Sequence, residues 1–460
     1  MGLIRQARDS EVSLLQSAID KIVNETQASG GAQATGARAR PKARVGIENA
    51  MVHQAAVLAH LKEAGAAIPD KPPLSPTSAE GAGQVAAYCA GLALKLAKAI
   101  FLGDDAERDS CKKQLEGPFT TCDSGYIEAA EQCALYFKAM HGVIPYVQWL
   151  KLGDYVYDKK ADGSELLPSN GKIGIIGDWG TGQERANQVL AKLAGKNPDV
   201  VVHLGDIYYS GVDHEAQGFF FDNWCKVLGL KPDANRRVTA ARPRTFSIPG
   251  NHDMYSGGAP YYVMIQQLGH SSSYFCLRNQ NWQFIAMDTG YNDHGVFDQN
   301  HFTTLRDTEV QWVLDKIQNN PSKLRTVLLS HHQPFSANDS FQNGGPVNTA
   351  FLDQLQPALS SVDLWLWGHE HDMVIFKSYQ DVQRGRCVGH GAYPVGRSEL
   401  ADKPGHAEVP LEDVKLTKGS AFYDNGYALI ELNGATATVK YFAVHEDGVA
   451  EDVLWIDDLR

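Results

Sequence analysis

The sequence predicts an α/β domain, with helices on both faces of its sheets, that follows an all-helical N-terminal domain. From about residue 166 onward, short β-branched runs alternate with amphipathic stretches, whereas the first 160 residues or so read as helical. The 460 residues are enough for two domains. We place the boundary in the polar, Gly- and Pro-containing segment 158–172, which gives domains of residues 1–165 and 166–460.

The N-terminal domain is expected to contain four helices and no catalytic motif. These helices are Glu11–Thr26, Ile47–Ala64, Gln84–Leu102 and Ser124–His141. In the first of them, Val12, Leu15, Ile19 and Ile22 recur at helical spacing. We interpret this region as a cap or as an oligomerisation element through which the chain could form homo-oligomers.

The second domain is expected to alternate strands and helices and to end in a hairpin. Six strands are predicted at Lys172–Ile176, Asp199–Leu204, Thr245–Ile248, Gln283–Met287, Arg325–Leu329 and Asp363–Trp367. Four helices are predicted at Gln183–Ala194, Tyr261–Gln267, Asp307–Gln318 and Asn348–Leu359. Asn433-Gly434, between the runs Tyr427–Leu432 and Thr436–Phe442, favours the tight turn of a hairpin.

Charge and targeting signals narrow the class of protein. The chain has 42 Lys and Arg against 54 Asp and Glu, a formal net charge of −12, which argues against binding to nucleic acid or to anionic membranes. The start of the chain lacks the apolar core of a secretory signal, and Lys95 and Lys98 interrupt the most apolar run. We therefore expect a cytoplasmic protein. Of the seven cysteines, Cys225, Cys276 and Cys387 are expected to be core thiols.

Clusters of metal-ligand side chains follow five of the predicted strands. They are Gly177-Asp178-Trp179-Gly180, Gly205-Asp206-Ile207-Tyr208-Tyr209, Gly250-Asn251-His252-Asp253, Ser330-His331-His332-Gln333-Pro334 and Gly368-His369-Glu370-His371. Because the carboxyl ends of the strands share one crevice in an open α/β sheet, these clusters can converge. Asp, Asn and His suit the same hard-to-borderline metals. The sequence therefore predicts a metal centre at this edge.

The set of motifs, in this order, resembles the calcineurin-like metallophosphoesterase superfamily, and within it the purple acid phosphatases of the small, tartrate-resistant type. The resemblance covers about residues 170–445 and implies a four-layer α-β-β-α sandwich. It also implies two metal ions. The first would be held by Asp178, Asp206, Tyr209 and His371; Asp206 would bridge to the second, which Asn251, His332 and His369 would also hold.

Two of these ligand assignments have alternatives in the sequence. A tyrosine phenolate is a hard anionic donor, so ligation by Tyr209 would favour Fe(III) as the first ion, beside a divalent Fe, Zn or Mn. The alternative for Tyr209 is a packed aromatic side chain next to Tyr208. In the family the ligand lies two residues before a proline, which selects His332, and His331 is the alternative.

Two further residues are expected to act on the substrate. In the family scheme His252 faces the phosphate, where it can stabilise charge or protonate the leaving group. By analogy with other carboxylate–histidine pairs, we expect Asp253 to orient it. Relatives carry another histidine before a Gly-Pro pair, but Gly344-Gly345-Pro346 stands here without one. His390 could replace that acid, although a structural loop histidine is the preferred interpretation.

The expected activity is hydrolysis of a phosphate monoester of a small molecule, by attack of a metal-bridging hydroxide as the resemblance implies. The first alternative is a phosphodiesterase of the same superfamily, acting on cyclic nucleotides or glycerophosphodiesters. The second is a non-catalytic scaffold protein with a vestigial site. The sequence favours the enzyme, because none of the seven expected metal ligands is missing.

Overall fold

The computed structural model describes residues 99, 103–107, 110, 144–160, 162–208, 211–238, 242–254, 257–292, 303–320, 323–341, 344–395, 404–420 and 422–460. The chain divides into two compact units. Unit 1 comprises Met1–Ile144, Tyr255–Gly257 and His294–His301, and unit 2 comprises Pro145–Met254, Gly258–Asp293 and Phe302–Arg460. The predicted N-terminal helices lie outside the described residues except for Ala99, which is helical and buried. No described helix is both long and apolar enough to span a membrane.

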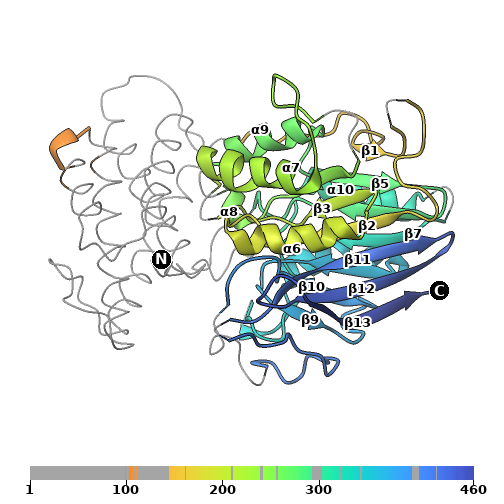
Figure 1. The fold of residues 1–460 in the computed structure, drawn as a ribbon. Coiled ribbons are helices and arrows are strands. Elements are labelled where there is room, and N and C mark those ends of the chain that lie inside the picture. Colours follow the sequence, from red (N-terminus) through yellow and green to blue (C-terminus); the bar gives the residue numbers. More distant parts are fainter. Residues whose placement is uncertain are drawn as a thin grey trace, which may run out of the picture. The chain divides into compact units, whose positions relative to one another are not determined.

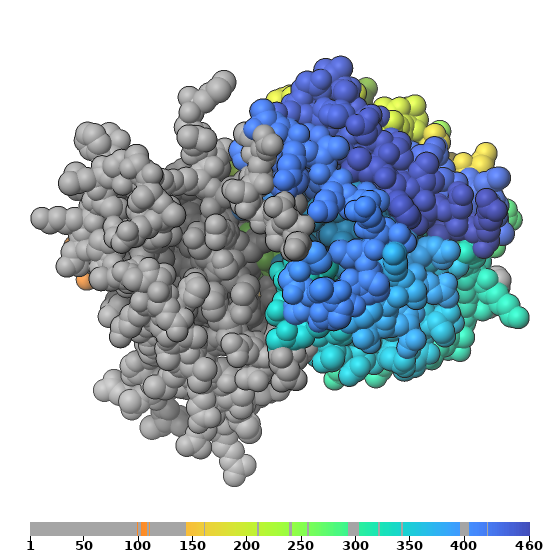
Figure 2. Space-filling model, turned by 90° about the horizontal axis from the view of Figure 1, so that it is seen from below, coloured from red at the N-terminus to blue at the C-terminus, as the bar shows by residue number. Residues whose placement is uncertain are grey.

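Unit 2 is built on two β-sheets (Figure 1). The seven-stranded sheet has the order β1 (Val156–Tyr157), β5 (Phe275–Arg278), β6 (Trp282–Ala286), β7 (Arg325–Leu329), β8 (Leu364–Trp367), β10 (Gly385–Val388) and β9 (Met373–Ile375). The six-stranded sheet has the order β13 (Glu451–Leu459), β12 (Thr436–Val444), β11 (Asn425–Asn433), β2 (Lys172–Ile176), β3 (Val200–His203) and β4 (Arg244–Ser247). Seen from below, β11 to β13 in dark blue lie beside the lighter blue segment that contains β8 to β10 (Figure 2).

The helical segments follow the strands along the chain. They are α6 (Glu184–Gly195), the π-helical η2 (Glu215–Asp222), α7 (Asn223–Leu228), α8 (Asn251–Met254), α9 (Ala259–Leu268), α10 (Asp307–Gln318), α11 (Thr349–Leu355) and the 3₁₀-helical η4 (Gln356–Ser361). In α6 the apolar face consists of Ala186, Val189, Leu190 and Leu193, which are all buried.

The hydrophobic core lies between the two sheets. Side chains of β2 and β3, among them Ile175 and Val202, share one buried cluster with Phe284 of β6 and Leu329 of β7. Residues in alternate positions of the seven-stranded sheet, such as Leu328, pack instead against α10 and α11. On the other sheet, a Cβ added at Gly174 of β2 would collide with Leu193 of α6. Helices therefore cover the outer faces of both sheets, and the layers run α-β-β-α.

Most of the predicted elements of the second domain form as expected. β2, β7 and α10 have the predicted bounds, and the other predicted strands and helices differ by one or a few residues at their ends. The predicted helix Asn348–Leu359 is divided into α11 and η4, with Pro357 near the start of η4. The predicted hairpin is β11 and β12, paired from Asn425 to Val444 around Asn433-Gly434.

The residues just before the predicted boundary lie in unit 2. Val156 and Tyr157 form β1, which pairs in parallel with β5 at Cys276 and Leu277. The described segment 145–160 therefore adds an edge strand to the seven-stranded sheet, although the sequence placed it with the N-terminal domain. Two residues of strand are too short for a recognisable β pattern.

Candidate metal centre

Backbone hydrogen bonds bring together the loops that follow β2, β3, β7 and β8. Gly180 N–H donates to the Asp206 carbonyl (3.1 Å), which joins the loops after β2 and β3. Gly368 N–H donates to the His331 carbonyl (3.0 Å), which joins those after β7 and β8. His369 N–H then donates to Asp178 Oδ2 (2.9 Å) and links the two sheets. The strand-end motifs thus converge, as the sequence predicted.

One group of donor atoms surrounds the hydroxyl of Tyr208. The Tyr208 Oη lies 3.1 Å from Asp178 Oδ1, 3.2 Å from Asp206 Oδ2 and 2.9 Å from His371 Nε2. His371 Nε2 is also 3.5 Å from Asp178 Oδ1. The ring of Tyr393 stacks on the His371 imidazole with centroids 3.8 Å apart, which restrains the orientation of that ligand. We call the side chains of Asp178, Asp206, Tyr208 and His371 the first donor group.

A second group of donor atoms surrounds Asn251 Oδ1. This oxygen lies 3.1 Å from His331 Nε2 and 3.1 Å from His369 Nδ1, and the two nitrogens are 3.2 Å apart. His331 Nε2 is also 3.3 Å from Asp206 Oδ1. The side chains of Asn251, His331, His369 and Asp206 form the second donor group. Asp206 belongs to both groups, because its Oδ2 lies in the first group and its Oδ1 lies in the second.

The spacing of the donor atoms fits metal coordination. Ligands held about 2.0–2.2 Å from one ion, at right-angled or tetrahedral directions, lie about 3.0–3.5 Å from each other. The separations within the two donor groups span 2.9–3.5 Å. Carboxylate, phenol, amide and imidazole are all donors that first-row metals accept. The two donor groups therefore fit two cations that share Asp206.

The backbone around these residues is tightly constrained. Asp178, Asp206, His369 and His371 all adopt positive φ, between 50° and 76°, which non-glycine residues rarely do and which clusters at functional sites. A Cβ at Gly250 would collide with Asp206 Oδ1, and one at Gly368 would lie 2.5 Å from Asp178 Oδ2. The glycines of the motifs are thus needed for the close approach of backbone to carboxylates.

His331 is held with its Nε2 lone pair toward the second donor group. Its Nδ1 lies 2.9 Å from the Leu204 carbonyl, which can only accept, so Nδ1 carries the proton. Burial, and then the neighbouring His332 and His369, lower the pKa of His331 well below its usual value. A neutral imidazole with a fixed proton on the far nitrogen is the form that binds metal.

Asp253 holds the loops after β3 and β4 in place. Its Oδ2 accepts the backbone N–H of Asp206 (2.8 Å) and of Gly250 (2.6 Å). Burial, and then the Asp206 carboxylate, raise the pKa of Asp253 to about 8. The fully buried His252 has its Nε2 3.9 Å from Asp206 Oδ2 and its ring 4.6 Å from that of Tyr208. Both predicted catalytic residues therefore lie beside the donor groups.

The structure brings together six of the seven predicted ligands, and the seventh lies outside the described residues. Asp178, Asp206, Asn251, His369 and His371 all lie in the donor groups. Tyr209 lies outside the described residues, and the tyrosine in the first group is its neighbour Tyr208. The predicted ligand His332 lies with His331 and His369 in a group whose ligand nitrogens are all within 4.8 Å of one another. At both places an adjacent residue of the same type stands beside the predicted ligand.

The histidines without a motif have structural surroundings. His203 is buried, lies 3.1 Å from Ser247 Oγ and has its pKa lowered by burial to about 3, as expected for a core residue. His390 Nε2 lies 3.0 Å from the Phe442 carbonyl, and burial lowers its pKa to about 4. His390 is therefore a structural histidine. His214 is exposed. The predicted core cysteines Cys225, Cys276 and Cys387 are buried and free.

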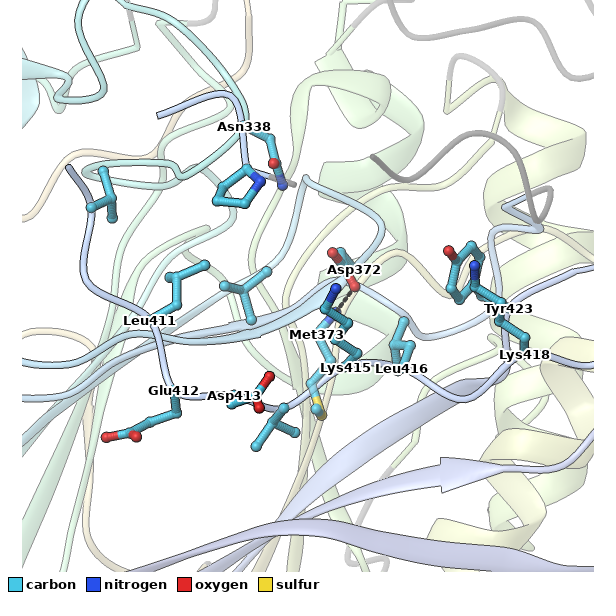
Figure 3. Close-up of a pocket in the computed structure, with 14 residues that line it drawn as sticks. Asn338, Asp372, Met373, Leu411, Glu412, Asp413, Lys415, Leu416, Lys418 and Tyr423 are labelled. Carbon is cyan, nitrogen blue, oxygen red and sulfur yellow. Dashed lines mark hydrogen bonds between the residues drawn. The ribbon is translucent and has the colours of Figure 1, made fainter. Parts of the chain in front are cut away.

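A pocket of about 440 Å³, which sequence reasoning missed, lies beside the segment that follows His371 (Figure 3). Its walls include Met373, Leu416 and Tyr423, and Lys415 lies near the Asp372 carboxylate. Burial raises the pKa of Asp372 to about 7. None of the donor-group residues lines this pocket. No sequence signal pointed to it, because its walls come from segments far apart in the chain.

Comparisons with known proteins agree with this geometry. A sequence model of the calcineurin-like phosphoesterase family matches residues 171–373, the segment that contains both donor groups. A search of curated protein sequences gave no match.

Several solved structures are similar to this chain. One is GAP50, the anchor in the inner membrane complex of Plasmodium, with 16% identity, a TM-score of 0.39 and coverage of 63% of this chain and 88% of that one. A dimetal phosphatase from Danio rerio has 14% identity, a TM-score of 0.41 and coverage of 62% and 98%. PhoD has 12% identity, a TM-score of 0.40 and coverage of 62% and 68%. Residues 171–373 thus match the calcineurin-like phosphoesterase family, and this segment contains the converging motifs and candidate metal-binding residues.

Proposed function

We propose that the protein is a phosphatase that holds two metal ions and hydrolyses phosphate monoesters of small molecules. The observation that carries this proposal is the pair of donor groups joined by the two oxygens of Asp206. A bridging carboxylate sets two cations about 3.5–4 Å apart, the separation that clamps both ends of an in-line displacement at phosphorus.

The donor groups suggest how the ions are held. Asp178, Tyr208, His371 and one oxygen of Asp206 would hold the first, and Asn251, His331, His369 and the other oxygen would hold the second. Cations held there supply Lewis-acid polarisation of the phosphate and activate water as the nucleophile. The positive φ of these residues and the close glycine contacts would keep their side chains in place for the ions.

His252 is proposed to act on the substrate, and Asp253 to position the site. The His252 ring is buried against the Tyr208 ring, and its backbone N–H donates to Asp206 Oδ1 (3.2 Å). From this place an imidazole can stabilise charge on the phosphate or protonate the leaving alkoxide. The hydrogen bonds of Asp253 to Asp206 N–H and Gly250 N–H support a positioning role, exerted through these backbone groups.

A tyrosine in the first donor group supports a purple-acid-phosphatase type of centre. A phenolate is a hard anionic donor and favours Fe(III) over Zn or Mn, and iron–phenolate centres are coloured. The second ion would then be a divalent Fe, Zn or Mn. We assign the phenol to Tyr208, because its hydroxyl lies between both aspartates and His371.

The alternative is a phosphodiesterase with the same metal-binding residues. The match to the calcineurin-like phosphoesterase family is compatible with either ester class, and the fit of the leaving group decides between them. Zn or Mn in both positions, without colour, would favour this alternative.

Elemental analysis of the purified protein, combined with assays on p-nitrophenyl phosphate and on its bis ester, tests the proposal. We expect about two metal equivalents per chain, iron among them, and faster hydrolysis of the monoester. Preference for the bis ester would establish the phosphodiesterase. A protein that binds no metal and turns over neither ester would be a scaffold.

A further inference from the structure

The loop after β6 packs against the turn that carries Asn251. We call its residues 288–291 the β6 loop. A Cβ added at Gly290 of this loop would lie 2.5 Å from the carbonyl oxygen of Gly250, so the two backbones are in close contact. β6 belongs to the seven-stranded sheet, whereas Gly250 follows β4 of the six-stranded sheet. The β6 loop therefore joins the two sheets beside the second donor group.

The backbone of Gly250 is also in close contact with residues of the donor groups. A Cβ at Gly250 would collide with Asp206 Oδ1 and would lie 2.7 Å from His331 Nε2. A Cβ at Gly205, in the loop after β3, would lie 2.5 Å from Gly250 N. Gly250 directly precedes Asn251, so a shift of the Gly250 backbone also moves the Asn251 side chain relative to His331. The contact with the β6 loop therefore affects the place of a ligand.

The same loop also holds the segment that follows β7. Thr289 is fully buried, and its Oγ1 accepts the backbone N–H of His332 at 3.0 Å. His332 directly follows His331, whose Nε2 lies 3.1 Å from Asn251 Oδ1 in the second donor group. Thr289 and Gly290 are neighbours, so the β6 loop contacts the segment of His331 and the segment of Asn251 through adjacent residues. The separation of these two segments therefore depends on the β6 loop.

Buried hydrogen bonds anchor the β6 loop at Asp288. The backbone N–H of Asp288 donates to Glu309 Oε1 of α10 (2.8 Å), and Tyr146 Oη donates to Glu309 Oε2 (3.0 Å). The Asp288 side chain accepts from Tyr291 N–H (2.9 Å) and from Ser273 Oγ (2.5 Å). Asp288 and Glu309 are both buried. These anchors lie outside both donor groups, so the loop can act as a fixed support for the segments that it contacts.

We propose that Thr289 and Gly290 are positioning residues for the second metal ion, because together they set the separation between Asn251 of one sheet and His331 of the other. This proposal rests on the proposed function, since it needs an ion at the second donor group. It predicts a selective effect. The side chains that belong to the first donor group alone follow β2, β3 and β8 and would keep their places when the β6 loop changes.

Gly290→Ala tests the proposal, with Gly195→Ala as its matched control. The added methyl group must displace the Gly250 carbonyl, whereas at Gly195 in α6 it meets no atom within 4 Å. We expect Gly290→Ala to bind the second ion about 10- to 100-fold more weakly and the first ion unchanged, the size of effect known for residues that support ligands. Calorimetric titration of the metal-free protein with Zn²⁺ measures both affinities. The occupancies of the two anomalous peaks, in crystals grown at limiting Zn²⁺, identify the weakened ion.

A second variant keeps the test available if Gly290→Ala does not fold. Thr289→Val removes the oxygen that accepts the His332 N–H and keeps the shape of the side chain. It should weaken binding of the same ion, and Thr289→Ser, which keeps the hydroxyl group, should restore it. Gly195→Ala should bind both ions like the wild type.

The outcomes separate this proposal from the proposed function. Unchanged binding of the second ion in either folded variant would overturn the proposal, as would an equal loss of both ions, which a general effect on the fold would cause. Thr289→Ser that binds as weakly as Thr289→Val would also overturn it. If the wild type binds two ions but hydrolyses neither ester, the phosphatase function fails, and the Zn²⁺ affinities still decide the role of the β6 loop. A wild type that binds no metal would overturn both.

Discussion

Two regions of unit 2 bury charged side chains and satisfy them in different ways. In one, Asp457 of β13 pairs with Arg386 of β10, and both side chains are about 5% exposed. In the other, histidines and a tyrosine surround Asp178 and Asp206, which are completely buried. Both regions join the same two sheets. They therefore differ in the side chains that surround the carboxylates and not in their place in the fold.

The Arg386–Asp457 pair is complete within the chain. The guanidinium binds both carboxylate oxygens (2.7 and 2.8 Å), and Tyr441 Oη and Trp455 Nε1 donate to the same carboxylate (2.9 and 3.0 Å). Burial alone would raise the pKa of Asp457, but the hydrogen bonds and charge of Arg386 lower it. Such a bidentate, fully hydrogen-bonded pair needs no outside ion and links the sheets.

The donor groups have the opposite character. Their atoms are lone-pair donors crowded at 2.9–3.5 Å, and the neutral state of His331 adds no positive charge. Burying two carboxylates among further acceptors is costly unless cations enter. A buried carboxylate paired with a guanidinium is therefore a structural feature, whereas buried carboxylates among imidazoles and a phenol indicate a metal site.

The largest effect is expected for Asp206→Asn. Loss of one bridging charge should remove much of the affinity for both ions, and activity should fall by at least about 10³-fold, since metal charge supplies several kcal/mol to the transition state. Elemental analysis and initial rates measure this. Full metal content with near-normal rates would contradict the assignment.

Asp457→Asn is expected to damage stability and leave the metal centre intact. Breaking a buried pair should lower the free energy of unfolding by about 3–5 kcal/mol, because Arg386 then keeps an uncompensated charge. Urea denaturation measures it, and Asp458→Asn, at an exposed carboxylate of the same strand, is the matched control. A loss of metal in Asp457→Asn comparable to that in Asp206→Asn would erase the distinction between the two regions.

Asp288 is a third case, in which burial makes a carboxyl group keep its proton up to about pH 6. Burial raises its pKa from 3.8 to about 6. The hydroxyl groups of Ser273 and Tyr262 each donate a hydrogen bond to its Oδ2. Because this pKa is higher in the folded state, the contribution of Asp288 to the free energy of unfolding is fully present below pH 3.8. It falls by about 3 kcal/mol in all as the pH rises to 6 and above. Asp288→Asn should lack this slope, because hydroxyl partners can reverse their hydrogen bonds. Urea denaturation of both proteins between pH 4 and 8 tests the prediction, and parallel curves would refute it.

The smallest expected effect distinguishes the two neighbouring tyrosines. Tyr208→Phe should abolish the visible colour of an iron-loaded protein and weaken Fe(III) binding by about 10- to 100-fold, with part of the activity retained when a divalent ion replaces iron. Tyr209→Phe should keep the colour. The visible spectra of the two variants decide, and loss of colour only in Tyr209→Phe would restore the ligand that the motif spacing predicted.

Sequence patterns predicted the strands that are short apolar runs and the helices that bury one face. β7 matches its prediction as an apolar run that is buried on both faces, and α10 matches as an amphipathic helix. β9 has only three residues, and β13 carries Asp457 toward the core, where a strand pattern calls for an apolar residue. Its partner Arg386 lies 71 positions away, so no local pattern could indicate the pair.

The sequence predicted which kinds of side chain would gather at the candidate metal centre. Five strand-end motifs indicated a metal centre, because the carboxyl ends of the strands meet in one crevice. The choices between Tyr208 and Tyr209 and between His331 and His332 depend on how each loop turns and on distant groups. The Leu204 carbonyl and the Thr289 hydroxyl, which contact His331 and His332, lie in the segments after β3 and β6.

Anomalous diffraction from a crystal of the metal-loaded protein can test whether two metal ions share the Asp206 carboxylate. We predict two peaks on either side of the Asp206 carboxylate, one bounded by Asp178, Tyr208 and His371 and the other by Asn251, His331 and His369. A single peak, or peaks away from Asp206, would contradict it.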